Sequence, residues 1–359
     1  MTPRALPMVS PRPGARPRLL GRPLGLALTA LLAASAPSLV ACSSTPEDDV
    51  GAELTEEQWM GVYLENALRY LDLGEIARAE DQARRALEIE PKNSRFLLIY
   101  GRCKLLRGDA QSIQASIEIF ESIPDKEDYR VQMTWGAAVE RKGVLYEEAA
   151  EGVRDGSRPT DFPDRAQRAD QLLEEARGYY REAKAHFQHS LELRSGEPEA
   201  LGGLVRTSAL LGEVEESIRY SRELIDAIRS SQRLVSLQLE DDEITAERES
   251  QLFSDQRTNR EFEVKARLHI ATLLRREGRL GEAVLEFDEI ILVQPELAEA
   301  HSLRAQLLYD LGEFVKARDS ITRFIELKAR TAEFEDPSIR RAYDLQERCD
   351  RAIAAARRG

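Results

Sequence analysis

Apolar residues recur along this chain at helical spacing, and glycines punctuate them at regular intervals. Each of six glycines closes one apolar stretch and precedes another: Gly74, Gly108, Gly143, Gly212, Gly278 and Gly312. Apolar positions three and four residues apart predict amphipathic helices, and a glycine between two such stretches predicts a turn. Ala, Leu, Glu and Arg are abundant, which favours helices over sheets. The pattern predicts an all-α protein built from helical hairpins.

The glycines also define a repeat of 34 residues. With each glycine at position 15, the units begin at Met60, Ser94, Tyr129, Pro198, Val264 and Ala298. Four units have a small residue at position 20 (Ala79, Ser217, Ala283 and Ala317), and prolines fall at position 32 in two units (Pro91 and Pro295). A small residue lets two helices approach closely, and a proline ends the second helix. These residues resemble the tetratricopeptide repeat (TPR), which implies an α-solenoid of antiparallel helix pairs over residues 56–335.

Two intervals between glycines are about twice as long as the others. The first contains a loop at 155–164 and then a further helical pattern, so we expect an insertion over about 144–194. Gly178 could be the turn of another repeat beginning at Asp164. However, Leu172, Tyr180 and Phe187 keep one helical phase through Gly178, which favours a single helix over about 165–194.

The second long interval contains neither Gly nor Pro over about 232–263. It predicts a helical hairpin over about 215–262, with its turn near Leu239–Glu243. After the repeats, Asp336-Pro337 resembles a helix start, with a capping residue followed by proline. The segment 336–359 is therefore expected to be a helix that caps the end of the solenoid.

The N-terminus carries a targeting signal. An uncharged run over 24–36 follows an arginine-rich stretch, and it is too short to cross a membrane as a helix but suits a signal peptide. The following Leu39-Val-Ala-Cys42 resembles the lipobox of bacterial lipoproteins. The resemblance implies that residues 1–41 are removed, that Cys42 is acylated, and that 42–55 is a tether. Translation could start at Met1 or at Met8.

The same resemblance implies a location in the cell envelope, anchored to a membrane by lipid. Ser43 follows the cysteine in place of Asp, which favours the periplasmic face of the outer membrane over the inner membrane. Without residues 1–41 the chain has 46 basic and 64 acidic side chains, a net charge of −18. Nucleic-acid binding needs a concentrated basic surface, so we expect no nucleic-acid partner.

Candidate chemistry is sparse. Of four histidines, His186 and His189 could share a helix face, but a zinc site needs further ligands. Cys103 and Cys349 lie several repeats apart, too far for a disulfide, and we interpret both as small core residues. Phosphate-binding glycine loops and catalytic triads are missing from the sequence. We therefore expect no enzyme activity, no cofactor, no metal and no small-molecule substrate.

The concave surface offers a binding hypothesis. In TPRs it is lined by positions 2, 5, 9, 12 and 13 of the first helix of each unit. Eight basic residues occupy such positions here: Arg95, Arg102, Arg130, Arg141, Arg206, Lys265, Arg275 and Arg276. Five acids do so as well: Asp72, Glu140, Glu199, Glu299 and Asp310. A basic balance within an acidic chain suggests a groove for an acidic or carboxylate-bearing segment of a protein partner. The alternative is that these arginines are solvated charges that keep the array soluble.

These features predict a membrane-anchored TPR scaffold that binds a protein partner in the bacterial cell envelope. The alternative is a cell-wall or polysaccharide-related factor that recruits an envelope enzyme or binds glycan. Aromatic residues in the groove would favour glycan, and Tyr309 is the one found at a lining position.

Overall fold

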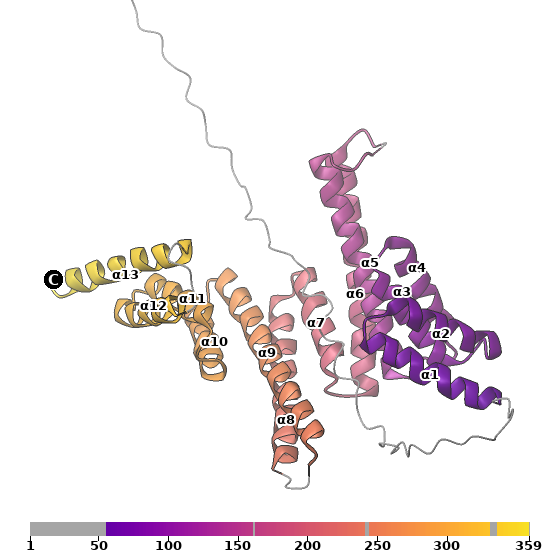
Figure 1. Ribbon diagram of the computed structural model, residues 1–359. Helices are drawn as coiled ribbons and strands as arrows, with labels where there is room; N and C mark the ends of the chain where they lie inside the picture. Colours follow the sequence, from indigo (N-terminus) through magenta and orange to yellow (C-terminus); the bar gives the residue numbers. More distant parts are fainter. Residues whose placement is uncertain (1–54, 161, 241–243, 331–335, 359) are drawn as a thin grey trace, which may run out of the picture. The chain divides into compact units, whose positions relative to one another are not determined.

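The described residues form α-helices joined by short connections, with no strand among them (Figure 1). A computed structural model describes residues 55–160, 162–240, 244–330 and 336–358. The helices are α1 (Glu56–Asp72), α2 (Ile76–Ile89), α3 (Ser94–Arg107), α4 (Ala110–Ser122), α5 (Tyr129–Asp155), α6 (Arg165–Leu193), α7 (Pro198–Leu211), α8 (Val214–Leu239), α9 (Ala246–Arg276), α10 (Leu280–Val293), α11 (Ala298–Asp310), α12 (Phe314–Ala329) and α13 (Pro337–Ala356). The predicted all-α solenoid is confirmed. The predicted signal peptide and Cys42 lie outside the described residues.

The helices stack in chain order, each packing against the next. Odd-numbered helices also approach one another: α1 packs near α3, α3 near α5, α5 near α7, and α11 near α13. Among the described residues, no two even-numbered helices come as close. A stack of helix pairs bends toward the side on which the helices are more closely spaced. The odd-numbered helices from α1 to α7, and α11 with α13, therefore form the inner layer, whereas α9 approaches neither α7 nor α11 in this way.

Five of the six predicted turn glycines lie between the paired helices. Gly74, Gly108, Gly212, Gly278 and Gly312 have φ angles between 72° and 80°. This left-handed backbone is costly for any residue with a Cβ atom. The predicted small residues at position 20 are also confirmed, because Ala79, Ser217, Ala283 and Ala317 are fully buried between helices.

The prediction of a turn at Gly143 was wrong. Helix α5 runs without interruption from Tyr129 to Asp155, and Gly143 lies inside it. A Cβ atom at Gly143 would lie 2.6 Å from the ring of Tyr180 on α6. The glycine is there because α5 and α6 pack closely, and the first helix of this unit is correspondingly long.

The interval after α5 contains one helix, α6, with Gly178 inside it. Helices α5 and α6 extend beyond the neighbouring pairs (Figure 1), where Ala150, Val153, Ala169 and Leu172 form a small core of their own. The second long interval is the α8–α9 hairpin, in which Val235 and Leu252 are buried. Helix α9 continues into the next unit without a break.

Helix α13 covers the end of the array. The side chain of Asp336 accepts a hydrogen bond from the backbone N–H of Ser338, which caps the helix. Ala342, Leu345 and Cys349 of α13 join the core formed by α8–α12. Cys103 and Cys349 are both free and fully buried, as expected of small core residues. Burial raises the pKa of the Cys103 thiol to about 12, so it is not a nucleophile at neutral pH.

Candidate protein-binding groove

The eight basic residues predicted to line the groove all lie on odd-numbered helices, namely α3, α5, α7 and α9. The structure does not make them equivalent, because ion pairs within the chain engage some of them and leave others exposed. The pairing of each cation with its own neighbours decides which of them can reach a partner.

Arg206 on α7 is bound to Glu140 on α5. Its Nε and Nη2 atoms donate to the two carboxylate oxygens at 2.7 and 2.9 Å, a bidentate pair. Burial alone would lower the pKa of the Arg206 guanidinium, but the Glu140 carboxylate outweighs it and the pKa is raised. Arg206 therefore joins neighbouring inner helices and is not free for a partner.

Arg130 and Arg141 on α5 also have partners in the chain. Arg130 donates from Nε and Nη2 to the carboxylate of Asp128, the residue that caps α5. A guanidinium nitrogen of Arg141 lies 3.3 Å from a carboxylate oxygen of Glu148, which is about two turns further along α5. The Arg141 pair is partly exposed, so water and salt weaken it.

Arg95 lies on the rim of a hollow between the first turns of α1 and α3. The floor is apolar (Met60, Leu64 and Phe96), and the rim also carries Glu56, Glu57 and Glu90. Three carboxylates beside one guanidinium make this hollow a poor site for an acidic segment.

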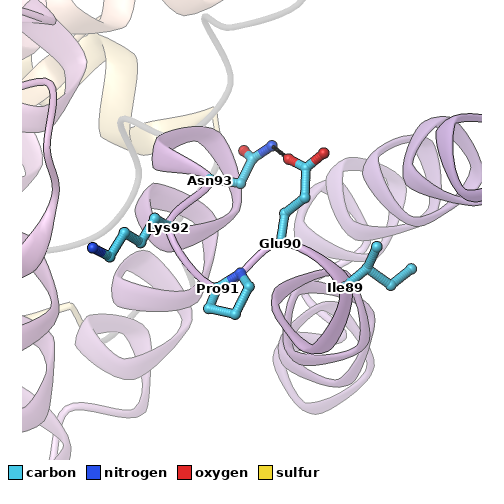
Figure 2. Close-up of a pocket in the computed structure, with 5 residues that line it drawn as sticks. All are labelled: Ile89, Glu90, Pro91, Lys92 and Asn93. Atoms are coloured by element: carbon cyan, nitrogen blue, oxygen red, sulfur yellow. Dashed lines mark hydrogen bonds between the residues drawn. The ribbon is translucent and has the colours of Figure 1, made fainter.

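A second hollow lies nearby, at the turn between α2 and α3 (Figure 2). It is lined by the five consecutive residues Ile89–Asn93. Asn93 Nδ2 donates to Glu90 at 2.7 Å, while Asn93 Oδ1 accepts from the backbone N–H groups of Arg95 and Phe96. The side chain of Asn93 therefore caps α3, and its polar groups are already hydrogen-bonded within the chain.

Two carboxyl groups lie together at the start of α7. Glu197 is buried and lies 3.2 Å from Arg194, while one oxygen of Glu199 is shielded from solvent and accepts no hydrogen bond. Burial, and then the hydrogen bond and charge of Glu197, raise the pKa of Glu199 to about 8, against the opposing charge of Arg102. A protonated Glu199 can donate to the Glu197 carboxylate, which gives its buried oxygen a partner. Sequence reasoning missed this pair, because it recognised Glu199 as a groove position but not Glu197.

This pair predicts that the protein loses stability as pH rises. Between the unfolded pKa near 4.5 and the folded pKa near 8, the folded chain keeps a proton that the unfolded chain has released. Glu199→Gln keeps a neutral hydrogen-bonding group and removes this dependence. We expect the variant to exceed the wild type by about 1–3 kcal/mol in free energy of unfolding at pH 8.5, and by less at pH 5, measured by urea denaturation.

The matched control is Glu121→Gln on the exposed surface of α4, which should leave the pH dependence unchanged. Parallel pH profiles for Glu199→Gln and the wild type would show that Glu199 is ionised at neutral pH in the folded protein.

The exposed cations gather on α9. Lys265, Arg275 and Arg276 are all exposed, and Lys265 lies 5.3 Å from the centre of the Phe262 ring. Within the described part of the chain, no carboxylate lies within ion-pair distance of Arg275 or Arg276. Lys265 and Arg276 are eleven residues apart, about 16 Å along the helix. We call these three residues the α9 basic stripe.

The histidines have structural roles. The ring of His186 stacks on Trp135 with centroids 4.3 Å apart and bonds Gln132 through Nδ1. Burial lowers the pKa of His186 to about 4, so its ring is neutral at physiological pH. His269 bonds the buried Ser217 at 2.9 Å. Over the residues that the structure describes, no three His, Cys, Asp or Glu side chains are placed to share a metal ion.

Two further observations bear on the expected partners. Tyr309, the aromatic residue at a groove position, is half-buried: the guanidinium of Arg348 covers one face of its ring, and Phe314 contacts the ring edge-on. None of the helices in the described ranges is both long enough and apolar enough to cross a bilayer.

Comparison with known proteins agrees with the repeat pattern. A tetratricopeptide-repeat family model matches residues 64–112 and 268–330. No curated protein matches the chain. Among solved structures, a thermophilic TPR protein from Thermus thermophilus aligns over 70% of this chain and 99% of its own, with 16% identity and a TM-score of 0.40.

Two other solved structures align at similar identity. YrrB, described as a TPR protein with an unusual peptide-binding site, aligns over 69% of this chain and 93% of its own, with 13% identity and a TM-score of 0.39. A tetratricopeptide repeat protein from Parabacteroides merdae aligns over 81% of this chain and 99% of its own, with 16% identity and a TM-score of 0.27. These likenesses are distant, so the assignment rests on the repeats and the helices themselves. The chain therefore contains tetratricopeptide repeats at 64–112 and 268–330, and its described helices form an all-helical, TPR-like solenoid.

Proposed function

We propose that this protein is a non-catalytic scaffold, anchored by lipid in the bacterial cell envelope, that binds an acidic segment of a protein partner. The observation that carries the binding proposal is the α9 basic stripe. Its three cations are exposed on α9 of an otherwise acidic protein, whereas Arg130, Arg141 and Arg206 are held by carboxylates of the chain.

The geometry of the stripe favours a particular kind of ligand. Arginine guanidinium groups bind carboxylates through two parallel hydrogen bonds, and two adjacent arginines can hold two acids or a chain terminus. Lys265 lies about 16 Å away on the same helix. A segment with acids spaced along five extended residues, or along three turns of helix, would reach all three cations.

Charge reversal tests this site. Arg275→Glu/Arg276→Glu should abolish capture of the partner from detergent-solubilised envelopes, because it replaces two attractive charges by two repulsive ones. Partners would be identified by mass spectrometry after pull-down with the wild type and the variant.

The control is Arg357→Glu/Arg358→Glu, which makes the same change in net charge at two adjacent exposed arginines at the end of α13. This variant should capture the same partners as the wild type. An unchanged partner set with Arg275→Glu/Arg276→Glu would refute binding at the α9 basic stripe.

The anchor rests on the lipobox sequence around Cys42, and the periplasmic face of the outer membrane is the proposed location. Cells supplied with labelled palmitate should incorporate the label into the wild type and into Cys103→Ala, since Cys103 is buried. Cys42→Ala should lose it. Label that persists in Cys42→Ala would contradict acylation at this residue.

A further inference from the structure

The first helix of the repeat array has an uncovered apolar face. Helix α1 packs against α2 and α3 through Ala67 and its partly buried neighbours. Trp59 is exposed by 40%, Val62 by 37% and Leu73, the C-cap residue of α1, by 61%, while Leu68, exposed by 42%, lies on another side of the helix. The spacing of Trp59, Val62 and Leu73 places them along one side of the helix. We call this side the α1 outer face. The other end of the array differs, because α13 covers it.

An aromatic pair stands at the N-terminal end of this face. The rings of Trp59 and Tyr63 stack with centroids 5.6 Å apart and an interplanar angle of 22°. Tyr63 is half-buried in the core of the first repeats, so the stack fixes the Trp59 ring on a rigid support. Trp and Tyr are the residues that concentrate at the boundary between membrane and water.

The charge of the α1 outer face differs from that of the whole protein. By helical spacing it contains two acids, Glu65 and Asp72, and one base, Arg69, with Gln58 and Asn66 between the apolar residues. The two acids of the first turn, Glu56 and Glu57, instead line the hollow shared with α3. The face therefore carries a net charge of only −1, in a chain whose net charge from Cys42 onward is −18.

The position of Cys42 in the sequence limits where α1 can lie. Thirteen residues, 42–54, separate the proposed lipid anchor from Thr55, the residue that caps α1. Whatever its conformation, a chain of that length spans at most about 47 Å. An acyl chain at Cys42 would therefore keep α1 closer to the bilayer than any later helix needs to be.

We infer that the α1 outer face docks on the surface of the lipid bilayer, with Trp59 and Val62 at the membrane–water boundary. This inference rests on the proposed anchor. Anchoring turns a weak surface contact into an intramolecular one at high effective concentration, so two or three apolar side chains suffice. Docking would fix the orientation of the first repeat relative to the membrane.

Tryptophan fluorescence tests this contact, because the chain has only Trp59 and Trp135 and Trp135 is buried. The chain from Cys42 to Gly359 would be coupled through Cys42 to a maleimide lipid in phosphatidylcholine vesicles. The other two cysteines are fully buried. We expect Trp59 emission to shift to shorter wavelength, and to be quenched when the acyl chains are brominated. Subtracting the signal of Trp59→Phe isolates Trp59.

Substitutions on two faces make the test specific. Val62→Glu places a charge on the α1 outer face and should abolish the shift and the quenching. Ala77→Glu makes the same change at an exposed position of α2 and should preserve both. Equal Trp59 emission in brominated and unbrominated vesicles would overturn the inference. So would a shift that appears without vesicles and grows with protein concentration, which would assign the face to a second copy of the chain.

The chemical coupling separates this inference from the proposed function. It supplies the anchor whether or not cells acylate Cys42, so a negative quenching result concerns α1 alone. Loss of palmitate labelling bears on the anchor, and loss of partner capture bears on the α9 basic stripe.

Discussion

Gly203→Ala should destabilise the protein by about 1–3 kcal/mol, the cost of forcing an extra atom into a close-packed core. A Cβ atom at Gly203 of α7 would lie 2.4 Å from the buried ring of Phe187 on α6. The ring cannot move away from α7, because it also packs against Gly136 of α5. A Cβ atom at Gly136 would lie 3.1 Å from the Phe187 ring. The phenyl ring is therefore packed between α5 and α7, and both helices need a glycine at the point of contact.

The neighbouring residue provides a matched control. A Cβ atom at Gly202 would meet nothing closer than 3.6 Å, the Nη1 atom of Arg206. Alanine is the better helix former, so Gly202→Ala should stabilise the protein by about 0.5–1 kcal/mol. Midpoints of urea unfolding would compare the two variants. Equal effects would mean that backbone propensity, and not contact with Phe187, determines the outcome.

Glu263→Ala should be the more damaging change, costing about 3–5 kcal/mol as expected when a buried ion pair loses one partner. Glu263 is only 2% exposed on α9, and it accepts hydrogen bonds from Arg229 of α8 at 2.9 Å and from Arg267 at 3.2 Å. Arg267 is itself buried and also reaches Glu286 and Glu289 of α10. The substitution removes the buried acceptor that Arg229 and Arg267 share, so both guanidinium groups lose a hydrogen-bond partner between α8 and α9.

Glu261→Ala, two residues away on the same helix, is the control. Glu261 is exposed and lies 3.4 Å from an exposed Arg257, so its loss should cost less than about 0.5 kcal/mol. Thermal unfolding followed by circular dichroism would measure both. If the two variants unfold at the same temperature, the buried network does not hold α8, α9 and α10 together.

The repeats were predicted correctly from the sequence where the regular spacing of glycine marked a turn between two helices. At Gly74, Gly278 and Gly312, a turn glycine is followed five residues later by a buried alanine. Gly143 misled because glycine is also used inside helices that pack closely, and its own spacing cannot distinguish the two uses. Position 20 of that unit is Glu148, not a small residue, but the unit of Gly108 has Ile113 there and still turns, so this position alone does not distinguish the two uses.

The groove was less predictable than the helices. Repeat positions identify which residues belong to the inner layer, but pairing between units depends on how neighbouring inner helices align. Nothing in the spacing of Glu140 and Arg206, 66 residues apart, indicates that they form a bidentate pair. The sequence likewise does not indicate that Glu197 and Glu199 share a proton, because the raised pKa of Glu199 results from its burial in the folded protein.

Helix α8 contributes to two separate cores. Ile218 and Ile225 on one side belong to the core of α8–α13, while Tyr220 on the opposite side belongs to the core of α4–α8. In the described chain, α7 and α9 do not approach each other. In a quasi-one-dimensional array, cooperativity passes only through neighbouring contacts, so α8 is the coupler between two blocks. Native-state hydrogen exchange should therefore give different opening free energies for the helices before α8 and for the helices after it, and a substitution that unfolds α8 should uncouple the two blocks.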